Sequence, residues 1–172
     1  MARRILLGIV VILFALSGCR RRAPTGFGSD DPAWLVGSTD ERFELVAMQL
    51  RGFDASMQEV DRRYQELFFA GRDANWEYAE YQTKKLRTAI ELAMMRRPKR
   101  TTNAKAFLET LPLLDQAIAY KDQALFSQRF ENLTLACNTC HVSEKYGFAN
   151  VVPPKERISS IRAVPSSSAS AK

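Results

Sequence analysis

The sequence has very few histidine and cysteine residues: one histidine, His141, and three cysteines among 172 residues. A structural zinc site requires four ligands. Because Cys19 lies in an N-terminal export signal, only Cys137, Cys140 and His141 are left, which is too few. A Ser-His-Asp triad would need the same histidine as its general base. We expect neither a zinc site nor a hydrolase of that type.

Strand signals are also missing. No stretch alternates between apolar and polar residues, no Asn-Gly or Asp-Gly pair marks a hairpin, and no internal repeat is present. A thioredoxin-like redox pair begins a helix that follows a strand, so this absence argues against that role for the cysteines. A chain of this length with 46% hydrophobic residues is typical of one globular domain. We therefore expect an all-α protein.

A strong excess of charge is missing too. The formal net charge is +6, and removing Arg3 and Arg4 with a cleaved signal peptide leaves +4. This charge favours an acidic partner or an anionic membrane surface, but it is too small to predict binding to nucleic acid.

The N-terminus predicts export. Its apolar run, residues 5–16, follows two arginines and is shorter than the ~20 residues of a spanning helix, which makes an uncleaved anchor the weaker alternative. Leu16-Ser17-Gly18-Cys19 resembles the bacterial lipobox, in which the cysteine becomes the lipid-carrying N-terminus. We expect a signal peptide over residues 1–18 and a lipid anchor at Cys19 on the periplasmic side of a bacterial membrane.

Composition divides the mature chain into three parts. Residues 19–37 are rich in Gly, Pro and small polar residues and predict a tether. Residues 38–150 are expected to form the folded domain. Residues 151–172 are rich in Ser, Ala and Pro and predict a disordered tail.

Apolar residues recur at helical spacing throughout this domain. A capping box, Ser38 to Glu41, begins a first helix that ends near Gly71. Asp73 caps a second helix, which stops before Pro98. The third and fourth helices are predicted over residues 102–121, kinked or restarted at Pro112, and from the cap Asp122 to Gly147. Four such helices favour an up-down-up-down four-helix bundle, with the cysteines near the C-terminal end of the last helix.

The cysteines and the histidine form one motif, Cys137-Asn138-Thr139-Cys140-His141. A disulfide between Cys137 and Cys140 is one interpretation, but it gives His141 no role. Cys-x-x-Cys-His is the attachment signature of c-type haem, in which both thiols bond the porphyrin and the histidine binds the iron. We therefore predict one covalent haem c, with His141 as proximal iron ligand.

A resemblance supports this interpretation. A haem motif near the end of the last helix of a bundle resembles the class II c-type cytochromes, the cytochrome c-prime group. More narrowly, residues 50–153 are similar to small bacterial monohaem proteins that share three elements of sequence: Leu67-Phe68-Phe69-Ala70-Gly71 with Asn75-Trp76, the Cys-Asn-x-Cys-His motif, and Gly147-Phe148. That group often carries Arg-His where this chain has Arg63-Tyr64, so a role for that histidine is not carried over and Tyr64 is expected in the core or pocket.

The sixth position on the iron decides between two activities. A methionine ligand favours electron transfer, and an apolar residue leaves a site for small gases. Met48 matches the level expected to face His141 on the first helix but lies off its apolar stripe, whereas Met57 lies on the stripe ~9 Å away from that level. The resemblance implies a methionine near Met57, which we prefer; Met94 and Met95 are weaker candidates. If neither Met48 nor Met57 binds the iron, Leu50 and Phe53 would form an apolar lid over the open position.

Two further clusters, one aromatic and one basic, are interpreted separately from the motif. The aromatic side chains between the first two helices are expected to pack in the core rather than against haem: Phe68, Phe69, Trp76, Tyr78 and Tyr81. The basic turn of residues 96–100 is expected at the haem end, where it could steer an acidic redox partner.

The sequence thus predicts a lipid-anchored, periplasmic monohaem cytochrome that transfers one electron and is not an enzyme, although weak peroxidase-type activity and a homodimer stay open. Two alternatives remain: a five-coordinate haem protein that binds or senses nitric oxide or carbon monoxide, and a helical lipoprotein without haem that has a Cys137–Cys140 disulfide.

Overall fold

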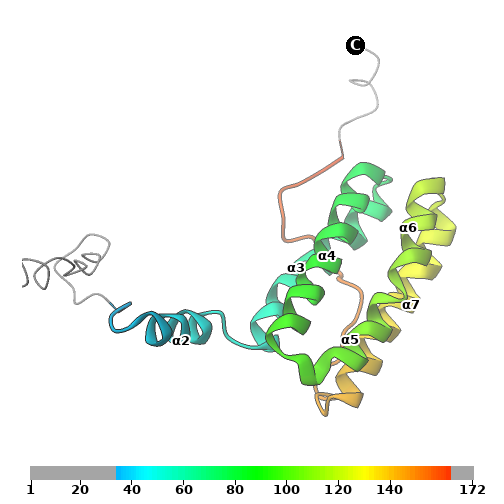
Figure 1. Cartoon of the computed structure of the whole chain (residues 1–172). Coiled ribbons are helices and arrows are strands. Elements are labelled where there is room, and N and C mark those ends of the chain that lie inside the picture. The colour runs from blue at the N-terminus through cyan, green and yellow to red at the C-terminus, as the bar shows by residue number, and fades with distance from the viewer. Residues whose placement is uncertain (1–33, 164–172) are drawn as a thin grey trace, which may run out of the picture. The chain divides into compact units, whose positions relative to one another are not determined.

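The computed structural model describes residues 34–163, and all of the regular secondary structure there is helical, as predicted (Figure 1). Its elements, in chain order, are α2 (Thr39–Gln49), α3 (Phe53–Arg72), α4 (Trp76–Arg96), the 3-10 helix η1 (Pro98–Arg100), α5 (Thr101–Leu108), α6 (Leu111–Tyr120) and α7 (Gln123–Ser143). None of these helices is long and apolar enough to cross a membrane. The predicted signal peptide and Cys19 lie outside the described residues.

The chain divides into two units, and α2 is the only helix described in the first. Its N-terminus confirms the predicted capping box. The Ser38 backbone N–H donates to Glu41 Oε2 at 2.7 Å, and the Glu41 N–H donates to Ser38 Oγ at 3.4 Å. No residue of α2 is buried, and Phe43 is 69% exposed.

The prediction of one continuous helix from Ser38 to Gly71 is wrong. The helix stops at Gln49, and α3 begins only after Arg51, whose φ of 53° is left-handed, and Gly52, its extended N-cap. The apolar spacing continues across this break, so periodicity does not detect it. Gly52 is the local cause that the sequence offers, because glycine costs about 1 kcal/mol in a helix relative to alanine.

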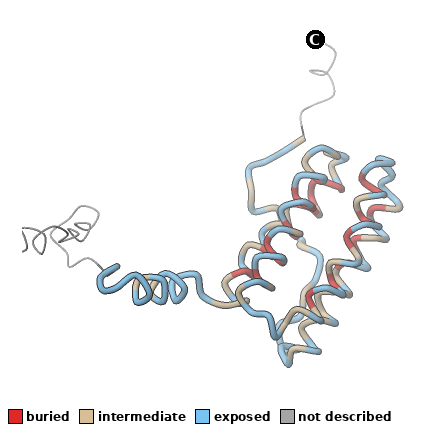
Figure 2. Tube along the Cα trace, in the orientation of Figure 1, coloured by how far each residue is buried: buried red, intermediate tan, exposed pale blue. Residues whose placement is uncertain are grey.

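The second unit holds the other helices around one core. α3 packs along α4, α4 also contacts α5 and α6, both of these pack on α7, and α7 contacts α3. Figure 2 shows buried residues in stripes along these helices. The largest fully buried hydrophobic side chains are Phe130, Leu67, Leu86, Leu111, Leu114 and Leu133.

The connections between helices follow the predictions at some ends only. Asp122 caps α7 as predicted, since its side chain accepts the Leu125 N–H at 2.9 Å. Pro112 lies in the first turn of α6, which confirms the predicted restart and divides the third segment into α5 and α6. Asp73, predicted to cap the second helix, instead ends α3, and Asn75 occupies the N-cap of α4.

The C-terminal end of α7 also differs from its prediction. The helix ends at Ser143, and the chain turns at Lys145, whose φ is 66°, rather than at Gly147. Residues 151–163, predicted to be disordered, are described and contact the helices: Arg157 forms an ion pair with Asp73 and donates to the Phe69 carbonyl at 3.2 Å. Arg157, whose side chain is 9% exposed, thus helps to attach a segment whose composition is typical of a flexible tail.

Candidate functional site

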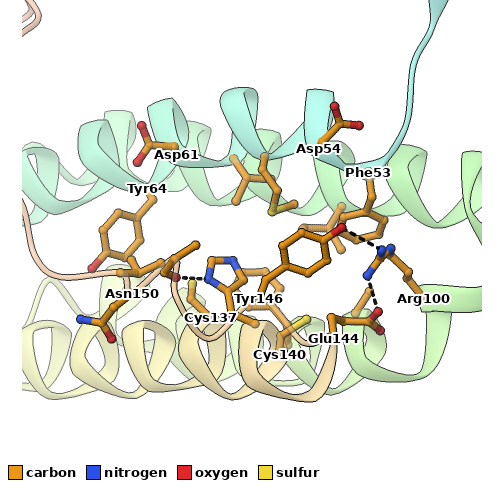
Figure 3. Close-up of a pocket in the computed structure, with 18 of the residues that line it drawn as sticks. Phe53, Asp54, Asp61, Tyr64, Arg100, Cys137, Cys140, Glu144, Tyr146 and Asn150 are labelled. Carbon is orange, nitrogen blue, oxygen red and sulfur yellow. Dashed lines mark hydrogen bonds and ion pairs between the residues drawn. The ribbon is translucent and has the colours of Figure 1, made fainter.

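The motif residues of α7 line a cavity of about 800 Å³ in the second unit. Figure 3 shows Cys137 and Cys140 on one wall and the α3 residues Asp54, Asp61 and Tyr64 on the other. The remaining walls come from α4, α5, the basic turn and the segment after α7. Residues far apart in the sequence therefore meet around Cys137, Cys140 and His141.

The two cysteines lie one helical turn apart, so their side chains project from the same face of α7. Both are free thiols. Burial raises the pKa of Cys137 to about 12, and burial also raises the pKa of Cys140, with Glu144 adding to the effect. A reactive redox pair needs a thiol whose pKa is lowered. The environment of these thiols is therefore the opposite of a thioredoxin-like site.

The His141 ring is oriented by the backbone of the segment that follows α7. Its Nδ1 lies 2.5 Å from the carbonyl oxygen of Ala149. A carbonyl oxygen only accepts, so Nδ1 carries the proton and Nε2 keeps a free lone pair. Metal-binding histidines commonly make such a bond with their second nitrogen. His141 therefore has the tautomer that leaves the Nε2 lone pair able to bind a metal ion.

The wall formed by α3, α4 and α5 is mainly apolar and contains one methionine. Phe53, Met57 and Val60 line it from α3, with Ile90 and Phe107 from α4 and α5. The structure thus brings Met57 into the same cavity as the motif.

The other methionine candidates are exposed or pack against the core. Met48, on α2, is 64% exposed, and Met95 is 76% exposed. Met94 packs against the core but does not line the cavity. Of the two residues expected to form an apolar lid, Phe53 lines the cavity and Leu50 does not, being 52% exposed.

A polar cluster forms one edge of the cavity. Arg100 pairs with Glu144 and donates to the Tyr146 hydroxyl at 3.4 Å (Figure 3). Asn103 donates to the second oxygen of Glu144 at 2.8 Å. Sequence reasoning did not find Glu144, Asn103 or Tyr146, because no periodic signal links α5 to the end of α7.

The basic turn lies at this edge, as predicted. Arg97 and Arg100 line the cavity, together with Cys140 and His141. Within residues 34–163, Arg97 forms no ion pair with a carboxylate; it donates to the Arg96 carbonyl at 2.8 Å. Its positive charge is therefore available to a ligand or partner at the cavity.

Tyr64 is a buried residue of the cavity wall, as expected. It is 3% exposed, and its hydroxyl lies 2.7 Å from Thr134 Oγ1. Because the Thr134 hydroxyl donates to the Phe130 carbonyl at 2.9 Å, Tyr64 is the donor in this pair. Burial raises the pKa of Tyr64 to about 12, so the phenol keeps its proton at neutral pH.

The predicted aromatic cluster lies outside the cavity lining. Phe69 is buried, Phe68 packs 5.2 Å from the Phe130 ring centroid, and Trp76 packs 6.1 Å from that of Phe126. These contacts confirm core packing for the three residues. Tyr78 and Tyr81 stack on each other at 6.2 Å, with Tyr81 47% exposed.

No protein-family model, curated protein or solved structure matches this chain. The resemblance to monohaem cytochromes therefore remains a prediction. Within the described residues, no group of three or more His, Cys, Asp or Glu side chains gathers to hold a metal ion.

The cavity fits a haem group in volume and in chemistry. Its volume falls within the range of about 300–1,000 Å³ that ligand pockets occupy. Apolar side chains suit the face of a porphyrin, and the two thiols and the imidazole share one wall. Arg97 and Arg100 supply positive charge at the edge, where carboxylates of a ligand would be stabilised.

Proposed function

We propose that this protein is a monohaem c-type cytochrome that transfers one electron. The observation that carries the proposal is a single apolar cavity that holds both thiols of the motif and an imidazole whose Nε2 lone pair is free. A disulfide-only lipoprotein would need neither the cavity nor the oriented ring.

Each residue of the site has a role in this proposal. Cys137 and Cys140 would hold haem c through thioether bonds, and His141 Nε2 would be the proximal iron ligand. Met57, from the facing wall, is the proposed sixth ligand. The bound haem would supply an iron that takes up and releases one electron. The apolar residues Phe53, Val60 and Phe107 would exclude water, and Arg97 would stabilise a porphyrin carboxylate.

The finer architecture is part of the same proposal. The packing of α3 on α4, of α4 on α6, and of α7 on both α6 and α3 supports an up-down-up-down four-helix bundle of the class II cytochrome type, in which α5 and α6 form one arm. We also propose export with a lipid anchor at Cys19, an acidic redox partner attracted by the basic turn, and a periplasmic location. The N-terminal sequence and the charges of Arg97 and Lys99 support these points.

Absorption spectroscopy tests the proposal after expression with haem-maturation machinery. Sharp α and β bands in the reduced protein are expected, because a six-coordinate iron is low-spin. A broad high-spin spectrum that changes with carbon monoxide would instead support the gas-binding alternative. A protein without a Soret band would contradict both. A His141→Ala variant is the control, since its low-spin bands should be lost.

A further inference from the structure

Asn138, inside the haem motif, joins α7 to the segment that follows it. Its side-chain Nδ2 donates to the Val151 carbonyl at 2.9 Å, and its Oδ1 accepts the Val151 N–H at 2.7 Å. One side-chain amide thus satisfies both backbone groups of a residue in irregular structure. Such a paired contact fixes the position of the backbone as well as its distance from the helix.

The clamped backbone also carries the partner of His141. Ala149 lies two residues before Val151, and its carbonyl oxygen accepts the Nδ1–H of His141 at 2.5 Å. Asn138 and His141 are three residues apart on α7, so they share one face of the helix. The residues Asn138, Val151, Ala149 and His141 therefore form a closed loop of contacts.

The start of this segment is held by other bonds. The Tyr146 N–H donates to the His141 carbonyl at 2.7 Å, and the Ala149 N–H donates to the Tyr146 carbonyl at 2.8 Å. These bonds fix the turn after α7 but leave the Ala149 carbonyl free to rotate with the chain beyond it. The Asn138 clamp lies on that far side.

We infer that Asn138 is a positioning residue that holds the Ala149 carbonyl against Nδ1 of His141 and so keeps the ring in its Nδ1–H tautomer. In water the neutral histidine ring carries its proton mainly on Nε2, and that tautomer has no lone pair for a metal at this atom. The hydrogen bond at the other nitrogen sets the tautomer. Asn138 would therefore prepare Nε2 for ligation before any ligand binds. Only the identity of that ligand, haem iron, rests on the proposed function.

The test uses the full-length chain, labelled with ¹⁵N-histidine and purified without haem attachment. Because His141 is the only histidine, its two ring nitrogens give unambiguous NMR signals. A pH series identifies the neutral form of the ring, whose two nitrogen shifts report the tautomer ratio. We expect mainly the Nδ1–H form in the wild type, and a several-fold shift toward Nε2–H in Asn138→Ala.

Two further variants separate positioning from folding. Thr139→Ala is the matched control, because Thr139 lies next in the motif and, within residues 34–163, its hydroxyl donates only to the Leu135 carbonyl of its own helix. Its tautomer ratio should equal that of the wild type. Asn138→Asp keeps the acceptor for the Val151 N–H but loses the donor, so an intermediate ratio is expected. If circular dichroism shows that Asn138→Ala is unfolded, the tautomer ratio of the Asn138→Asp variant decides whether Asn138 positions the ring.

A wild-type ring that is mainly Nε2–H, or a folded Asn138 variant with an unchanged ratio, would overturn the inference. The haem-loaded protein gives an independent reading, since a higher reduction potential is expected for Asn138→Ala, because the bond at Nδ1 makes the imidazole a stronger electron donor to the iron. If the chain never takes up haem, the proposed function fails while the tautomer measurement still decides the role of Asn138.

Discussion

The chemistry of this molecule is concentrated in a few residues of one helix end. Cys137 and Cys140 are protonated thiols because burial raises the pKa of each, and His141 presents an unprotonated Nε2 because Nδ1 is bonded to the Ala149 carbonyl. Met57 lines the same cavity from α3. In the proposed cytochrome, these four side chains would supply the two haem tethers and the two iron ligands.

The proposed role of Met57 predicts a change of spin state on substitution. Met57→Leu keeps an apolar side chain of similar volume, which should cost less than about 1.5 kcal/mol of stability, but it removes the thioether sulfur. We expect the haem-loaded variant to become high-spin and to bind carbon monoxide, as absorption spectra would record. Met94→Leu is the control, because Met94 lies outside the cavity lining. A Met57→Leu protein that stays low-spin would rule out this ligand.

Because Tyr64 is buried, we expect the free energy of unfolding to fall at alkaline pH. Burial raises its pKa to about 12 in the folded chain, against about 10 when unfolded. The contribution of Tyr64 to the free energy of unfolding is therefore complete below pH 10 and is lost as the pH rises toward 12, because the phenol ionises first in the unfolded chain. Tyr64→Phe should be about 1 kcal/mol less stable at neutral pH, through the lost bond to Thr134, and the difference should shrink above pH 10.

Urea unfolding of the haem-loaded proteins between neutral pH and about pH 11 measures this difference. The haem-loaded form is used because Cys137, as a thioether, would not ionise in this range. Tyr120→Phe serves as control, since Tyr120 is 67% exposed. A gap between wild type and Tyr64→Phe that stays constant with pH would show that the folded and unfolded pKa values are equal.

At the scale of elements, the close approach of α3 and α7 depends on Gly71. A Cβ built there would lie 2.0 Å from Phe126 Cε1, and Phe126 is itself packed between Trp76 and Phe130. Helix propensity alone would make Gly71→Ala stabilising by about 1 kcal/mol. We expect instead a loss of about 1–3 kcal/mol in the free energy of unfolding, because the buried Phe126 ring would have to shift.

The matched variant is Gly147→Ala, whose Cβ would first meet Val142 Cγ2 at an ordinary 3.5 Å. Its urea midpoint should change little. A Gly71→Ala protein as stable as the wild type would show that the two helices can separate without cost.

Elements with a continuous apolar stripe and clear end signals could be predicted from the sequence. The cap at Asp122 and the stop of α4 before Pro98 are confirmed for this reason. The break at residues 50–52 could not be predicted, because the stripe runs through it and a single Gly52 in a helical pattern is often tolerated. The same holds for the site: the motif was readable, whereas the clamp from Asn138 to Val151 joins a helix to irregular structure and leaves no periodic signal.

At the scale of the whole molecule, the second unit combines an apolar cavity with a basic edge. Arg97 and Lys99 are exposed beside that edge, and Arg100 is held there by Glu144. Positive charge next to a redox site favours fast encounter with an acidic protein, and the effect falls with ionic strength. This arrangement is what an electron carrier tethered near a membrane would need.

Mass spectrometry of the mature protein tests the central claim most directly. After expression with haem-maturation machinery, the peptide spanning residues 135–148 should carry the mass of one haem that denaturant does not remove, and a variant with both Cys137→Ala and Cys140→Ala should carry none. A wild-type peptide whose two sulfurs are free thiols, or are bonded only to each other, would contradict the account.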